Sequence, residues 1–118
     1  MTQEAAKKER VTKVIEVLNK ARSMELYAVH QYMNQHYNLD NLDYGEFASK
    51  IKLIAIDEMR HAENFAERIK ELDGEPVSEL SSKITKGQKV ADVFPFNVKV
   101  EDDTIETYNA LLEICRAN

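Results

Sequence analysis

Apolar residues recur every three or four positions along three long stretches of the chain, which is the spacing that predicts amphipathic helices. The first stretch runs from about residue 2 or 8 to about residue 38, and the second from about residue 43 to about residue 73. A third begins near Pro95, a residue that the first turn of a helix tolerates. The polar stretch 75–92 is long enough to cross from one end of a bundle to the other. The pattern therefore predicts an all-α bundle.

Local signals mark both ends of the second predicted helix. Asp43 is followed three residues later by Glu46, which resembles a capping box, so we expect Asp43 to cap this helix. Gly74 and Pro76 are typical of the residues that stop a helix.

Carboxylates occupy inward positions on all three predicted helices. Glu25 follows the apolar spacing of the first helix, and Glu58 and His61 lie three residues apart on the apolar face of the second. On the third helix, Tyr108 and Ile105 lie on the inward stripe, and stepping back four residues from Ile105 gives Glu101. Because a buried glutamate is rare unless it is paired, three in register indicate a shared partner.

The types of these residues point to a metal. In a helical bundle, an inward-facing Glu-x-x-His is the arrangement of di-iron and di-manganese carboxylate sites. Carboxylates and imidazole both suit iron, and two metals about 3.5–4 Å apart can act on O2 or peroxide. Tyr32, two turns after Glu25, would place a phenol there, although a core tyrosine explains it equally well. For Glu101 the alternative is a charged helix start within the acidic run 101–103.

Composition limits the class of protein. A chain of 118 residues can bury one core, and 3 glycines and 2 prolines favour helices. The net charge of −5 without a basic tract gives no support for a nucleic-acid partner. No apolar run reaches membrane-spanning length, so we expect no membrane partner. The single cysteine, Cys115, excludes an internal disulfide and suits a small core residue of a cytoplasmic protein.

Two segments carry a resemblance to a known family. Residues 18–32 and 56–63 resemble bacterioferritin, and the likeness continues through 67–69 and 72–76 and, more weakly, into the third helix. The resemblance implies a ferritin-like four-helix bundle that oxidises Fe(II) with O2 or peroxide at an intrasubunit di-iron centre. It further implies a homo-oligomer that stores the product in a 24-subunit shell. A b-type haem would lie on the two-fold axis of each dimer, between subunits.

The resemblance also assigns roles to individual residues. Glu25 matches a terminal carboxylate, Glu58 a bridging carboxylate, His61 a histidine ligand and Glu101 the carboxylate that opens the second ligand pair. Met59 matches the methionine that ligates the haem. Met59 also lies about 100° around the helix from Glu58, away from the core stripe, so an interface methionine without haem is the alternative.

The sequence departs from the family after its third helix. The family's fourth helix carries a second Glu-x-x-His, and no counterpart of it precedes Asn118. We therefore expect a single ferritin-like domain over residues 1–118, incomplete at the C-terminus, with three of the four bundle helices. A fragment, a natural short form completed by its oligomer and a degenerate relative all fit. The stretch 111–118 ends in mid-pattern, which favours a fragment.

Two functions follow from these observations. The first is an iron-storage protein with ferroxidase activity, an enzyme that oxidises Fe(II). The second is a non-catalytic helical assembly module that binds a single metal or an inter-subunit haem.

Overall fold

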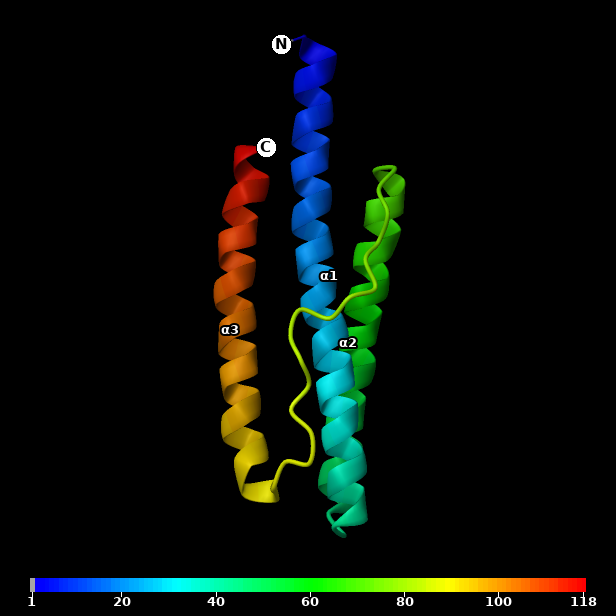
Figure 1. Ribbon diagram of the computed structural model, residues 1–118, viewed down its shortest axis with the longest axis vertical. Coiled ribbons are helices and arrows are strands. Elements are labelled where there is room, and N and C mark those ends of the chain that lie inside the picture. Colours follow the sequence, from blue (N-terminus) through cyan, green and yellow to red (C-terminus); the bar gives the residue numbers. More distant parts are fainter. Residues whose placement is uncertain (1) are drawn as a thin grey trace.

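Three long helices make up the structure, a computed structural model that describes residues 2–118; Met1, where the predicted domain starts, lies outside the described part. They are α1 (Gln3–Asn41), α2 (Gly45–Glu71) and α3 (Val90–Ala117). Residues 2–118 contain no strand. α1 lies between the other two and runs antiparallel to both (Figure 1). The all-α prediction with three helices is confirmed.

The core lies mainly between α1 and α2. On α2, the small residues Ala48, Ala55 and Ala62 recur every two turns, and all three are buried. Small side chains at this spacing let the two helix backbones approach closely. Leu39 and Ile69 are fully buried, and each contributes about 1.5–3 kcal/mol relative to an exposed position.

Helices α1 and α2 end in the same backbone motif. An aspartate with positive φ follows each helix, 68° at Asp43 and 62° at Asp73. The next amide, of Tyr44 or Gly74, donates to a backbone oxygen five residues earlier at 2.9 Å, which is a Schellman ending. The predicted capping box is therefore wrong. Asp43 belongs to the turn that ends α1, and Tyr44 is the N-cap of α2 without a side-chain capping bond.

Position 74 has no room for a side chain, so a glycine is required there. A Cβ atom there would lie 2.9 Å from Cγ2 of both Ile15 and Ile69. The chain can therefore leave α2 and pass over α1 only where a side chain is missing. The helix itself already ends at Glu71.

The start of α3 was predicted too late. α3 begins at Val90, so Pro95 lies inside the helix. Its missing N–H removes one intrahelical hydrogen bond, which packing of the first two turns offsets. Val93 is fully buried there, and the Phe94 ring meets the Phe47 ring of α2 edge-on with centroids 4.5 Å apart.

The segment between α2 and α3 crosses the bundle along α1, as predicted (Figure 1). Asn19 of α1 donates to the Glu75 carbonyl at 3.0 Å and accepts from the Val77 amide at 2.9 Å. Arg22 donates to the Val77 carbonyl at 2.8 Å. None of the helices in the described chain combines the length and apolar character needed to cross a membrane.

Candidate metal centre

Glu25, Glu58 and His61 come together where α1 faces α2. One ligand atom from each residue lies within 4.8 Å of the other two. Nδ1 of His61 is 3.6 Å from Oε1 of Glu25 and 4.0 Å from Oε1 of Glu58. The helical spacing of Glu58 and His61 puts both on one face, and the alanines around Glu25 let α1 approach that face. Three of the four predicted ligands are therefore adjacent.

The Glu25 carboxylate is only half satisfied. This residue is 4% exposed, and its Oε1 accepts a hydrogen bond from the Tyr108 hydroxyl at 2.5 Å. Its Oε2 is the buried side-chain oxygen that has no hydrogen-bond partner within residues 2–118. A buried carboxylate oxygen without a donor is costly, so a cation fits this position. Two carboxylates and one imidazole also form a donor set that suits iron.

The cluster is open on one side. The His61 side chain is 53% exposed, whereas the Glu58 side chain is mostly buried. Burial, then the hydrogen bond with the adjacent Glu25 carboxylate and its charge, and then the charge of Glu101 raise the pKa of Glu58 to about 9. Glu58 therefore holds a proton at neutral pH that a bound cation would displace.

Two tyrosines cross between α1 and α3. Tyr32 of α1 donates to Oε1 of Glu101 at 2.5 Å, and Tyr108 of α3 donates to Glu25. Burial and these carboxylate contacts raise the pKa of both phenols well above the ordinary value for tyrosine. Both tyrosines therefore remain protonated donors. Tyr108 was not predicted as a site residue.

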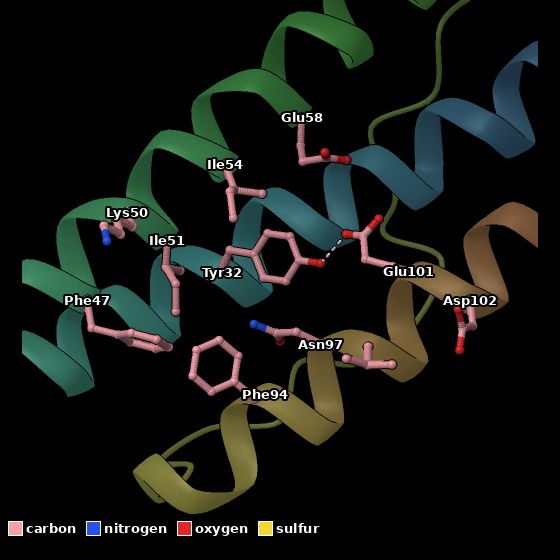
Figure 2. Close-up of a pocket in the computed structure, with 11 residues that line it drawn as sticks. Tyr32, Phe47, Lys50, Ile51, Ile54, Glu58, Phe94, Asn97, Glu101 and Asp102 are labelled. Carbon is pink, nitrogen blue, oxygen red and sulfur yellow. Dashed lines mark hydrogen bonds between the residues drawn. The ribbon is translucent and has the colours of Figure 1, made fainter.

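Glu101 lies beside the cluster and does not belong to it. Its carboxylate shares a pocket of about 890 Å³ with Glu58 and Tyr32, as Figure 2 shows. Ile105, which the sequence placed on the same inward stripe, is 59% exposed, so that prediction is wrong. The other two residues of that stripe, Glu101 and Tyr108, do contact α1, and Glu101 is itself exposed. Glu101 stays a predicted ligand.

Met59 lies away from the core, as the helical geometry predicts, and is 53% exposed. Its role as a haem ligand stays a prediction.

Comparison with known proteins identifies the fold. Residues 15–118 match the ferritin family, described as a ferritin-like domain. The chain is 60% identical to a bacterioferritin of Desulfovibrio desulfuricans over 93% of this chain and 62% of that protein. It is 37% identical to a bacterioferritin of Brucella melitensis over 87% of this chain and 64% of that protein.

The solved structures that resemble this chain are also bacterioferritins. The X-ray structure of the Desulfovibrio desulfuricans bacterioferritin, described as showing its diiron site in different catalytic states, has a TM-score of 0.91 and 60% identity. The match covers 93% of this chain and 64% of that one. A Rhodobacter capsulatus bacterioferritin with a metal-free dinuclear site and a haem iron on a crystallographic special position has a TM-score of 0.84 at 28% identity. That match covers 90% of this chain and 66% of the other.

The chain spans slightly less than two thirds of the length of these relatives. Its resemblance to bacterioferritin is confirmed, and its three helices are three of the four in a ferritin-like bundle. On its helical architecture and the match over residues 15–118, the chain belongs to the ferritin family.

Proposed function

We propose that this chain contributes the iron-binding core of an iron-storage protein that oxidises Fe(II) with O2 or peroxide, and is thus a ferroxidase. The observation that carries the proposal is the cluster of Glu25, Glu58 and His61, in which the buried Glu25 carboxylate keeps one oxygen without a hydrogen-bond partner among the described residues. The 60% identity to a bacterioferritin whose structure contains a diiron site supports it.

Each residue has a distinct task in this proposal. Glu25 and Glu58 supply the negative charge that binds Fe(II), and Glu58 releases its proton as the cation arrives. His61, half exposed, adds a neutral nitrogen ligand at the open side of the cluster. Tyr108 fixes the orientation of Glu25 through Oε1, and Oε2 keeps its full capacity to bind a cation. Iron, when bound, supplies one-electron redox chemistry toward O2 or peroxide.

Residues of the α1–α3 contact complete the proposed site. Glu101 adds a third carboxylate, and a fourth ligand, from α3 to a di-iron centre, in keeping with its place beside Glu58 in one pocket. Tyr32 acts as the catalytic phenol, because its hydroxyl contacts Glu101 directly and can donate a hydrogen bond or an electron.

The assembly is proposed on similar grounds. Met59 lies exposed on α2, where a two-fold partner could supply a second methionine to a b-type haem between subunits. The haem iron on a special position in the Rhodobacter capsulatus bacterioferritin supports this arrangement. We propose a homo-oligomer of such dimers, up to a 24-subunit shell, in the cytoplasm and without nucleic-acid or membrane partners.

Aerobic addition of Fe(II) with absorbance monitoring tests the proposed activity. We expect rapid oxidation by the parent protein and a large loss of rate in Glu58→Ala. Glu63→Ala removes an exposed carboxylate from the same helix and should oxidise Fe(II) like the parent. A parent that oxidises Fe(II) no faster than Glu58→Ala contradicts the proposal.

A non-catalytic module is the second candidate, because the described residues bring together three ligand atoms, enough for a single metal. Metal binding without oxidation would favour it. Addition of haem tests the methionine separately. A Soret band that disappears in Met59→Leu supports haem ligation, and a band that persists in this variant refutes it.

A further inference from the structure

The contact between α1 and α3 is mainly polar. Among residues 90–117, only Val93 is buried, and the rings of Phe94 and Tyr108 meet Phe47 and Phe65 edge-on, so apolar packing alone constrains the rotation of α3 only at a few points. Hydrogen bonds between side chains join the two helices at three levels: Gln35 with Asn97, Tyr32 with Glu101, and Glu25 with Tyr108. These directional contacts are what can fix the rotation of α3.

Gln35 and Asn97 form the only reciprocal pair among these levels in the described chain. Nε2 of Gln35 donates to Oδ1 of Asn97 at 2.7 Å, and Nδ2 of Asn97 donates to Oε1 of Gln35 at 3.0 Å. The second hydrogen on Nε2 goes to Oε1 of Gln88 at 2.8 Å. Gln35 is 1% exposed, so a shift of Asn97 would leave buried amide groups unsatisfied.

The position of Asn97 determines that of Glu101. The two residues lie four apart on one helix, which separates them by about 40° around the axis and about 6 Å along it. Figure 2 shows Asn97 and Glu101 on the same side of α3, both pointing into the pocket that Tyr32 of α1 also lines. Holding Asn97 against Gln35 therefore holds Glu101 at the Tyr32 hydroxyl.

We propose that Gln35 and Asn97 are positioning residues. Their amide pair holds α3 in the rotation at which Glu101 meets Tyr32 beside the Glu25–Glu58–His61 cluster. The consequence for metal binding rests on the function proposed above. The effect on the Tyr32–Glu101 contact does not, since it exists in the metal-free protein.

Gln31 provides a matched control. It is a second fully buried glutamine one turn before Gln35 on α1. Its amide exchanges hydrogen bonds with the backbone of Thr85 at 2.9 and 2.8 Å and donates to Gln88 at 3.3 Å. Gln31 thus binds the crossing segment and, within the described residues, makes no hydrogen bond to α3, whereas Gln35 hydrogen-bonds to both.

NMR of the metal-free protein, with ¹³C at Cζ of tyrosine, tests the positioning. Tyr32→Phe assigns the Tyr32 resonance among the 5 tyrosines, and Glu101→Ala gives its position without the hydrogen bond. The test variant is Gln35→Met with Asn97→Leu, because replacing both partners by apolar groups of similar shape is nearly neutral for stability. We expect its Tyr32 resonance to move most of the way to the Glu101→Ala position.

Two outcomes overturn the proposal. One is a Tyr32 resonance in the double variant that stays at the parent position. The other is an equal displacement in Gln31→Met, since this would reflect a general loosening of the fold. Gln35→Met alone should give the same shift as the double variant, and it leaves only the partly exposed Asn97 amide without its partner, which keeps the test valid if the double variant folds poorly.

Co(II) titration, followed by visible absorption, tests the link to the metal. We expect Asn97→Leu to weaken Co(II) binding about tenfold, the usual effect of losing a residue that orients a ligand. Added to Glu101→Ala, the same substitution should cause no further loss. Additive losses would show that Asn97 acts independently of Glu101. A parent that binds no Co(II) would contradict the proposed function, and the Tyr32 resonance would still decide the positioning role.

Discussion

The Tyr108 hydroxyl donates a hydrogen bond to Oε1 of Glu25 at 2.5 Å, while Oε2 of this carboxylate has no partner in the described chain. The contact is half of a crossed pair. Each of α1 and α3 carries a glutamate followed seven residues later by a tyrosine, Glu25 with Tyr32 and Glu101 with Tyr108. Because the helices run antiparallel, each tyrosine meets the glutamate of the other helix (Figure 1).

We expect Tyr108→Phe to destabilise the metal-free protein. The substitution leaves the buried Glu25 carboxylate without its donor, which should lower the free energy of unfolding by about 1–3 kcal/mol. Urea denaturation measures the change. Tyr37→Phe is the control, since Tyr37 lies exposed on the same helix as Glu25. Equal stability of the two variants would show that Tyr108 does not satisfy Glu25.

The raised pKa of Glu58 predicts an unusual pH dependence. The carboxyl group keeps its proton in the folded state up to about pH 9, whereas the unfolded chain releases it near the ordinary value of 4.5. Between these values the folded state binds more protons, so the free energy of unfolding falls as pH rises. Urea denaturation at a series of pH values, with a chelator present, should show this decline.

Glu58→Gln supplies the control for this pH dependence. The amide cannot ionise, so the variant should lose most of the decline and exceed the parent in stability at pH 8 to 9. Its metal affinity should nevertheless be lower, because the amide is a weaker ligand for iron. A parent and a variant with parallel pH profiles would contradict the assignment of the raised pKa to Glu58.

The sequence alone predicted those features of the site that depend on a single helix. Residues three or four apart share a helical face whatever the helix packs against, so the adjacency of Glu58 and His61 followed from spacing. The inward position of Glu25 followed in the same way, and it is confirmed by burial. The partner of Tyr108 depends on how α1 and α3 align, and that alignment is set by contacts between residues far apart in the chain.

Local sequence signals gave the wrong starts for α2 and α3, because backbone turns and tertiary packing determine where these helices begin. Asp43 has the side chain of a capping residue, but its backbone adopts the positive φ of the Schellman turn that ends α1, so it does not cap α2. Pro95 looked like a helix start, but burial of Val93 extends α3 by five residues before it. The buried amides of Gln31 and Gln35 were also missed. Their spacing of four, on the row beside Tyr32, was the available signal.

Gly74→Ala tests whether this glycine is needed for space. A methyl group would meet Cγ2 of Ile15 and of Ile69 at 2.9 Å, so we expect a loss of about 1–3 kcal/mol in unfolding free energy. The loss should shrink in an Ile15→Ala background, where α1 no longer fills that space. Gly45→Ala, whose Cβ would approach nothing closer than 3.8 Å, should be neutral or stabilising. A similar cost at both glycines would indicate a backbone effect.

Zn(II), which is redox-inert, tests the metal cluster without any oxidation chemistry. A ligand that binds only the folded state stabilises it by about 2.7 kcal/mol at 100 times its dissociation constant. His61 is half exposed and supplies a nitrogen ligand, so His61→Ala should leave the metal-free protein at parent stability. The stabilisation by Zn(II) should fall by about 1.4 kcal/mol for each tenfold loss of affinity.

His30→Ala is the control for this prediction. It removes an exposed histidine of α1, so it should retain the full effect of Zn(II). If both variants respond to Zn(II) as the parent does, the metal binds elsewhere; if His61→Ala alone loses the response, the imidazole beside Glu25 and Glu58 is a ligand.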